Sequence, residues 1–331
     1  MLNRLKNFVK VRTRDVQWVI CYRKKDKNAL LYDGSYDNKF TTIRPTIRYW
    51  FADPIINEIE GEEYLFCEMY DVIKKKGAIG ISYKKKNGEW SKPKKILGGG
   101  KADEHLSFPV VIKWKGDYYM FPCIGNGIIQ VYKMGKNECE WNLWCELFDD
   151  HYYVDTIFIN IDEHLYMISG AKDKNNPLKT KLSINEILDL EIKDKMVITS
   201  AVSEGNVYEM STRNAGKLLE IKKNDENINW LRVTQESDEV YGYGYNLQFR
   251  SFSMDGGKIN ESLYYRVLRE ELITDIDNSI YFEIIGPHTY SQSKNDEVID
   301  IKVNAFSIVY VIRYVIDNIK LLLAGGKVKN G

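Results

Sequence analysis

The stretch from Phe51 to Met69, FADPIINEIEGEEYLFCEM, has two counterparts further along the chain. They are LSFPVVIKWKGDYYMFPCI, which starts at Leu106, and VDTIFINIDEHLYMISGA, which starts at Val154. Each has a polar residue near its start, then an apolar run, a short polar turn and an aromatic strand. This order is typical of two β-strands joined by a hairpin, repeated along the chain.

The repeat has a period close to fifty residues. The leading polar residues are Asp53, His105 and Asp155, which lie 52 and 50 residues apart. A third strand follows the first two stretches and ends at Trp90 and Trp141, 51 residues apart. Three or four antiparallel strands that repeat every ~40–50 residues are the mark of a β-propeller blade. The alternative, a β-sandwich of irregular hairpins, does not repeat this order at a fixed period.

We therefore predict an all-β fold, a five-bladed β-propeller with a short C-terminal helix. Three segments are expected: a basic N-terminal segment (1–15), the propeller (16–304), and an amphipathic C-terminal helix and tail (305–331). WVICYR (18–23) should pair with EVIDIKV near Asp300 and close the ring, which removes exposed strand edges. Blade four is expected to begin near Val207. Blade five is expected to contain YGYNLQFRSFSM, ESLYYRVLREEL and EIIGPHTYSQS.

Composition excludes several classes of protein. The 331 residues carry 47 Lys+Arg and 47 Asp+Glu, and this zero net charge argues against a nucleic-acid partner. Five scattered cysteines without a CxxC pair fit reduced thiols in a cytosolic protein. The N-terminus lacks the apolar region of a signal peptide, and no window is apolar enough to span a membrane. We expect a cytoplasmic protein.

The C-terminal run AFSIVYVIRYVIDNIKLLLAGG (305–326) is almost continuously apolar, with charged residues at helical spacing on one side. This pattern favours a helix that lays its apolar face on the propeller or on a partner protein. A peripheral contact at the inner face of the membrane, helped by the basic N-terminal segment, is the alternative.

The first strand of each propeller blade lines the central axis, so the leading polar residues should converge on one funnel. Ionisable groups gathered there cost desolvation free energy unless they act on a ligand. The candidate catalytic residues are Asp53, Asp155, His105 and Glu209. The candidate substrate-binding residues are Glu68, Glu204, Arg213, Arg232, Gln235, Tyr241 and His288. Each has a structural alternative: a turn cap for the aspartates, a core hydrogen bond for His105 and salt bridges for the arginines. No metal-ligand cluster is evident.

The order of motifs resembles the propeller domain at the N-terminus of glucosamine inositolphosphorylceramide transferases. The resemblance runs from about Trp18 to Val303, and its most specific parts are FADP and HLSFP followed by the tyrosine-rich strand. The other shared motifs are WVICYR, LFCEMY, VDTIF, STRNAG, LRVTQ, YGYG, GPHTY and VIDIK. More remotely, the chain resembles the five-bladed glycoside hydrolases of family 43, whose funnel holds three carboxylates.

The hydrolase resemblance implies Asp53 as general base, Asp155 as an orienting residue and Glu204 or Glu209 as the acid. The chain departs from that pattern at His105 and at the two arginines of blade four, so hydrolysis is not the first expectation. We expect a glycosyltransferase of cell-surface glycan synthesis, with a nucleotide or phosphate sugar as co-substrate and a glycan acceptor as partner. A family-43-type hydrolase and a non-catalytic glycan-binding propeller are the alternatives.

Overall fold

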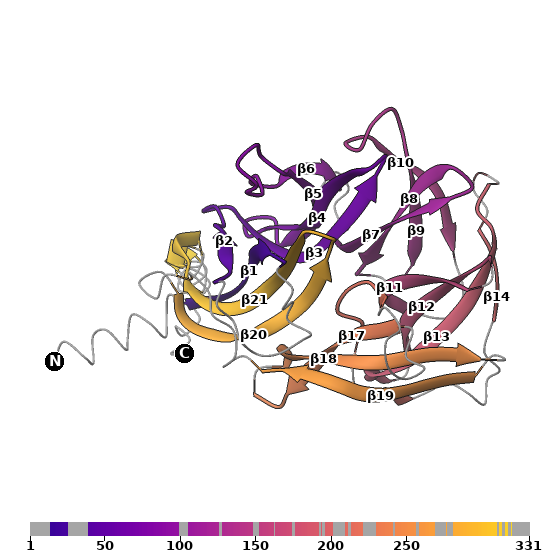
Figure 1. Ribbon diagram of the computed structural model, residues 1–331. Coiled ribbons are helices and arrows are strands. Elements are labelled where there is room, and N and C mark those ends of the chain that lie inside the picture. Colours follow the sequence, from indigo (N-terminus) through magenta and orange to yellow (C-terminus); the bar gives the residue numbers. More distant parts are fainter. Residues whose placement is uncertain are drawn as a thin grey trace.

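The strands of the computed structural model form five antiparallel sheets around a central axis (Figure 1). The structure describes residues 14–25, 39–98, 105–125, 128–147, 152–161, 163–173, 176–191, 193, 196–200, 209–210, 213–220, 230–240, 242–255, 258–268, 276, 281–309, 311–312, 315–316 and 319. The predicted five-bladed propeller is thus confirmed. The basic segment before residue 14 lies outside the described residues.

Blades one to three follow the chain, and in each the first strand is the innermost. Blade one contains β3 (Tyr49–Ile59), β4 (Glu62–Asp71), β5 (Lys76–Tyr83) and β6 (Lys94–Leu97). Blade two contains β7 (Leu106–Trp114), β8 (Asp117–Ile124), β9 (Ile129–Met134) and β10 (Trp141–Leu147). Blade three contains β11 (Tyr152–Ile161), β12 (His164–Asp173), β13 (Asn176–Asp189) and β14 (Val197–Ser200), and β15 (Glu209–Met210) also pairs with β13.

Blade four contains β16 (Leu219–Glu220), β17 (Trp230–Asp238), β18 (Gly242–Asp255) and β19 (Lys258–Val267). Blade five contains β20 (Tyr281–Gln292) and β21 (Asp296–Phe306), completed by β1 (Arg14–Lys24) and β2 (Thr41–Ile43). The prediction that β18 and β19 belong to blade five was therefore wrong. Because the N-terminal strands supply the outer half of blade five, that blade needs only two strands from the C-terminal part of the chain.

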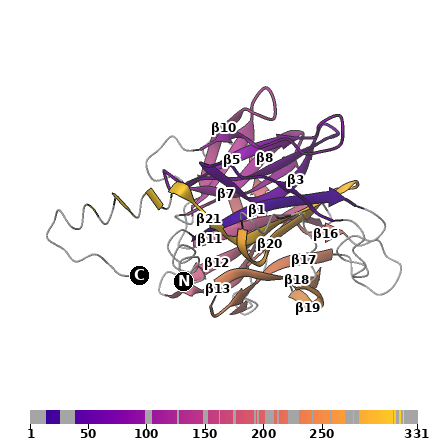
Figure 2. The same cartoon turned by 90° about the vertical axis from the view of Figure 1, so that its left-hand side faces the viewer.

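The two ends of the propeller meet in blade five. β1 pairs with β21 in one unbroken antiparallel register, from Arg14 opposite Phe306 to Lys24 opposite Asp296. Figures 1 and 2 show this pair of strands from two directions. The predicted ring closure is confirmed, and it places Ile20 directly opposite Asp300, both of them buried.

The core lies between neighbouring blades, where the aromatic residues of the repeat meet. Phe66 and Trp141 pack edge to face between blades one and two, with ring centroids 6.0 Å apart. Phe249 and Tyr290 do the same between blades four and five, at 5.3 Å. Such pairs add to the hydrophobic gain of burying large rings, so they hold each sheet against the next.

A bulge recurs in the innermost strands at the same place. Asp53, Phe108 and Asp155 have φ values of 50°, 46° and 50°, and the strand register shifts at each of them. The sequence motifs ADP, SFP and VDT are therefore structurally equivalent. His105 lies three residues before its bulge and is the counterpart of Trp50. The prediction that His105 shares the position of the two aspartates was wrong. It assumed a nearly even period, whereas the equivalent bulge residues Asp53, Phe108 and Asp155 are unevenly spaced.

The predicted C-terminal helix is not supported as an element of the fold. After Phe306, the described residues 308–309, 311–312, 315–316 and 319 have helical backbone, and the Val311 N–H donates a hydrogen bond to the carbonyl of Ser307 at 3.1 Å. Val309 packs against the cluster that contains Trp50, but Ile312 and Ile319 are half exposed. Among the described residues, no helix is long and apolar enough to cross a bilayer.

Candidate functional site

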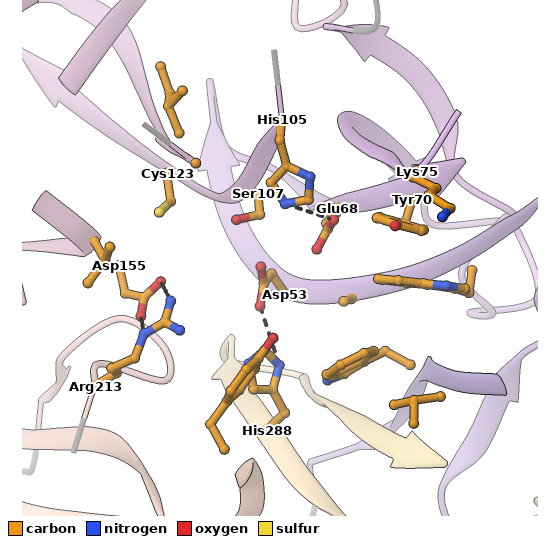
Figure 3. A pocket seen from close by; sticks show the side chains of 18 of the residues that line it. Asp53, Glu68, Tyr70, Lys75, His105, Ser107, Cys123, Asp155, Arg213 and His288 are labelled. Carbon is orange, nitrogen blue, oxygen red and sulfur yellow. Dashed lines mark hydrogen bonds and ion pairs between the residues drawn. The ribbon is translucent and has the colours of Figure 1, made fainter. Parts of the chain in front are cut away.

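A cavity of about 640 Å³ opens on the propeller axis. Ionisable side chains from all five blades line it: Asp53, Glu68, His105, Asp155, Arg213 and His288 (Figure 3). Sequence analysis predicted all six, and the structure brings them together in one funnel. Their roles in binding or catalysis remain predictions.

The recurring bulge explains why the two aspartates point into the funnel. An extra residue in a strand turns its side chain away from the regular alternation and bends the strand. Asp53 and Asp155 occupy this position, and aspartate tolerates the left-handed backbone better than most residues. Phe108 occupies the same backbone position in blade two, where its side chain is buried in the core instead.

Asp53 is buried and held by neighbours on both sides. Its Oδ2 accepts a hydrogen bond from Phe108 N–H at 3.0 Å, and its Oδ1 accepts one from the Thr289 hydroxyl at 3.1 Å. Burial raises its pKa to about 6, with His288 opposing the rise and Asp300 adding to it. The carboxyl therefore titrates close to neutral pH, as expected of a general base.

Asp300, on β21, fixes the groups around Asp53. Its carboxylate accepts hydrogen bonds from the Asp53 N–H at 2.9 Å, the Thr289 N–H at 2.6 Å and His288 Nδ1 at 2.9 Å. Burial alone would lower the pKa of His288, but the hydrogen bond and the charge of Asp300 outweigh it and raise that pKa. Asp300 thus orients both Asp53 and His288.

Asp155 and Arg213 join blades three and four across the funnel. Arg213 Nε lies 2.5 Å from Oδ2 and Nη2 lies 2.8 Å from Oδ1, which is a bidentate pair. Asp155 raises the pKa of Arg213 despite burial, so the guanidinium stays charged. The negative charge of Asp155 is therefore neutralised within the protein.

Glu68 and His105 face each other across blades one and two (Figure 3). Glu68 Oε1 lies 3.5 Å from His105 Nε2, and the Gly77 N–H donates a hydrogen bond to His105 Nδ1 at 2.9 Å. Burial, followed by the charges of Asp53 and Asp300, raises the pKa of Glu68 well above its usual value. Burial and Lys76 lower the pKa of His105.

Aromatic rings form one wall of the funnel. Trp50 stacks on Tyr70 with ring centroids 4.2 Å apart and planes 11° apart, and Trp18 packs against Trp50 at 5.2 Å. Tyr243 continues the wall towards His288, at 5.5 Å. Burial raises the pKa of Tyr243 to about 12, so its hydroxyl stays protonated.

Other predicted site residues lie elsewhere. Arg232 is fully buried behind the funnel, with Nε 2.5 Å from Glu261 Oε1 and Nη1 2.6 Å from Asn214 Oδ1, so its predicted contact with substrate was wrong. Gln235 is also buried, and its amide donates to the carbonyl of Asn214. For Glu209 only the backbone in β15 is described, and Glu204 and Tyr241 lie outside the described residues.

Sequence reasoning missed Asp300 and Thr289, and it did not identify which rings form the aromatic wall. Asp300 had a readable signal, because a charged residue between Ile299 and Ile301 on a buried strand requires partners. Asp53, His288 and Asp300 each offer a ligand atom within 4.8 Å of the others, so among the described residues this trio is a group that could hold a cation. The hydrogen bonds described above already engage all three side chains.

The model of the family described as Glucosamine inositolphosphorylceramide transferase 1, N-terminal, matches residues 44–259. The matched range covers the strands of blades one to three and most of blade four. No curated protein in the comparison matches the chain.

Among solved structures, three of those similar to this chain are carbohydrate-active enzymes. An α-L-arabinofuranosidase from Lactobacillus brevis has 14% identity, with 80% of this chain and 88% of that chain covered, and a TM-score of 0.47. An exo-1,5-α-L-arabinanase from a bovine ruminal metagenomic library has 13% identity, coverage of 68% and 86%, and a TM-score of 0.45. An exo-β-1,3-galactanase from Phanerochaete chrysosporium has 12% identity, coverage of 75% and 54%, and a TM-score of 0.45. The chain spans about half the length of that galactanase, and likeness at this level does not bear on activity.

Proposed function

The chain belongs to the family of glucosamine inositolphosphorylceramide transferase 1, N-terminal domains, and from this premise we propose that its funnel binds a carbohydrate and transfers a glycosyl unit. A carbohydrate-related propeller is what the family indicates; the transfer reaction is the proposal. The observation that carries it is Asp53, a buried carboxylate on the axis whose pKa of about 6 leaves it ionised at neutral pH.

Asp53 is the proposed general base. It would accept the proton of an acceptor hydroxyl while that oxygen attacks the anomeric carbon of the donor. The His288–Asp300 pair beside it would hold the acceptor, and the rings of Trp18, Trp50 and Tyr70 would contact the apolar faces of the sugars. The proposed co-substrate is an activated sugar, with a nucleotide sugar as first choice, and a cytoplasmic location is part of the same proposal.

A phosphate leaving group needs positive charge, and Arg213 and Lys75 are the arginine and lysine that line the funnel among the described residues. Arg213 is 27% exposed and keeps part of its guanidinium surface towards the cavity while it binds Asp155. Arginine recognises phosphate by the same bidentate geometry that it uses with a carboxylate. A donor phosphate would therefore compete with Asp155 for Arg213.

A hydrolase is the second candidate, and Glu68 is the observation that favours it. Glycoside hydrolysis needs one carboxyl that is protonated and one that is ionised. Burial and the charges of Asp53 and Asp300 raise the pKa of Glu68 well above its usual value and favour its protonated form, whereas Asp53 ionises near pH 6. The two candidates share the base and differ in the acceptor, which is a sugar hydroxyl or a water molecule.

The test is a thermal-shift and turnover screen with nucleotides, nucleotide sugars and simple glycosides, on the wild type and on Asp53→Asn. Ligands of the folded state raise the melting temperature. We expect a nucleotide sugar to raise it in both proteins, and turnover to fall by at least ~100-fold in the variant. Glycoside cleavage without an acceptor would favour the hydrolase. Binding without turnover would favour a glycan-binding propeller, and no shift with any sugar ligand would contradict the proposal.

A further inference from the structure

Glu68 differs from the other carboxylates of the funnel in the strand on which it lies and in the contacts that its side chain makes. It lies on β4, the second strand of blade one, opposite Ala52 of β3 and Ile79 of β5. Its side chain is 8% exposed, and Oε1 has no hydrogen-bond partner among the described residues. A Cβ at Gly77 would lie 2.5 Å from Oε1, so glycine there gives the carboxyl its room. A buried polar atom without a partner, directed into a cavity, indicates a ligand.

The neighbouring histidine cannot supply a positive charge to Glu68. The Gly77 N–H donates to His105 Nδ1 at 2.9 Å, so Nδ1 carries a lone pair and the ring hydrogen is on Nε2. The ring is therefore neutral, and its Nε2 lies 3.5 Å from Glu68 Oε1 without forming a hydrogen bond to it. Burial and Lys76 both favour this neutral form.

Without a cation, Glu68 is stable in this place only as a neutral acid. An ionised carboxylate that is buried and unpaired costs several kcal/mol. Asp53 and Asp300 add repulsion, and among the described residues the one ion-pair partner within reach of Glu68 is the neutral His105. A neutral carboxyl carries an O–H donor, and His105 carries an N–H donor. Two donors thus converge on one part of the funnel.

We propose that Glu68 and His105 form a donor subsite that binds an uncharged carbohydrate oxygen, with the Glu68 carboxyl as the group that contacts the substrate. This inference rests on the proposed binding of carbohydrate in the funnel and names the substrate class at that site. Tyr70 lies beside the subsite, with its ring centroid 6.1 Å from that of His105, and provides an aromatic surface for the same sugar ring. A site of hydrogen-bond donors selects a sugar that carries the matching oxygen and rejects its deoxy analogue.

The test is calorimetric binding of methyl glycosides of glucose, galactose, mannose and N-acetylglucosamine between pH 6 and pH 9. We expect Glu68→Gln, which remains neutral and keeps a donor, to bind within ~3-fold of the wild type at pH 6. Glu68→Met, which has neither, should bind at least ~10-fold more weakly. The affinity of the wild type should fall towards high pH as Glu68 ionises, whereas that of Glu68→Gln should not. The matched control is Glu58→Gln, a change at an exposed glutamate of the same blade.

Other outcomes overturn the proposal. If Glu68→Gln binds as weakly as Glu68→Met, or if wild-type affinity rises with pH, an ionised Glu68 is the binding group. If no glycoside binds the wild type, the subsite does not recognise uncharged carbohydrate. Infrared difference spectra of the unliganded wild type and Glu68→Gln provide a second measurement, in which the variant should lose one protonated carboxyl band. An unchanged spectrum in that region would also overturn the proposal. Turnover in Asp53→Asn tests the proposed reaction separately, because these binding and spectroscopic measurements do not need it.

Discussion

Asp155 and Arg213 form a bidentate ion pair that joins blade three to blade four at the funnel, with bonds of 2.5 and 2.8 Å. Asp155 belongs to a strand bulge, and Arg213 directly precedes Asn214, which forms a bridge with Thr234 of blade four. Asn214 also donates to the Asp155 carbonyl at 2.8 Å. This contact fixes the mutual position of the two blades at the site.

The first prediction concerns this pair. Asp155→Asn should lower the free energy of unfolding by about 3 kcal/mol, because Arg213 then stays mostly buried without its counter-ion. Asparagine tolerates the left-handed backbone at this position, so the bulge itself should persist. The double variant Asp155→Asn/Arg213→Met should be more stable than Asp155→Asn alone. Urea unfolding of the wild type, Asp155→Asn, Arg213→Met and the double variant measures the coupling, and strictly additive losses would show that the two side chains act independently.

The second prediction concerns how the ionisation of Asp53 changes the stability of the folded protein. Its pKa is about 6 in the folded protein against an ordinary value of 3.8, so the folded state binds its proton more tightly than the unfolded state does. The contribution of Asp53 is therefore most favourable below pH 4 and is lost as the pH rises through 6, by about 3 kcal/mol in total.

Asp53→Asn removes this titration. Asparagine can still accept from Phe108 N–H and donate to the Thr289 hydroxyl, so the fold should be kept. The stability of the variant relative to the wild type should rise between pH 4 and pH 7, as measured by denaturant unfolding across that range. A constant difference would show that the folded-state pKa of Asp53 is not raised.

The third prediction concerns catalysis by Asp53. As the base, it acts only when ionised, so kcat/KM should fall ~10-fold per pH unit below about pH 6. The measurement is the pH profile of kcat/KM on the best donor and acceptor found in the screen. A profile that stays flat down to pH 5 would exclude Asp53 as the base.

The fourth prediction concerns Lys217, which reaches across the axis from blade four to blade one. Its ammonium donates to the Ile56 carbonyl at 3.3 Å and to Asn57 Oδ1 at 3.1 Å, and it lines a second cavity of about 510 Å³. Burial lowers its pKa to about 8, with Glu58 opposing the change.

The pKa of Lys217 is about 8 in the folded state, below its ordinary value of 10.5. Between pH 8 and pH 10.5, folding therefore releases the proton of Lys217. Its contribution should make the wild type more stable by about 1–3 kcal/mol as the pH rises from 8 to 10.5. Lys217→Met should lack this gain. Unfolding curves of both proteins at pH 8 and pH 10 test this, and parallel changes in the two proteins would contradict the lowered pKa.

The sequence predicted the blade architecture because the polar–apolar–turn–aromatic order depends on local periodicity. It also predicted the family, which the matching family model confirms. It placed Asp53 and Asp155 correctly since both follow an apolar strand start in the repeat. It failed for His105 because the prediction assumed an even period, whereas the equivalent residues Asp53, Phe108 and Asp155 are unevenly spaced in the sequence.

The remaining errors come from long-range contacts. Arg232 interrupts an apolar strand just as a funnel residue would, but its partners Glu261 and Asn214 lie 29 and 18 residues away and could not be inferred from its own strand. Asp300 contacts Asp53 across 247 residues of sequence. The C-terminal run is apolar enough for a docked helix, yet Ile312 and Ile319 are half exposed.

The most direct measurement is a crystal structure of Asp53→Asn soaked with a sugar ligand that stabilises the protein in the thermal-shift screen. The sugar should occupy the axial cavity, with one oxygen within hydrogen-bond distance of residue 53 and its ring against the aromatic wall. A sugar bound on an outer face of the blades, with the axial cavity free of it, would contradict the assignment of the funnel as the working site.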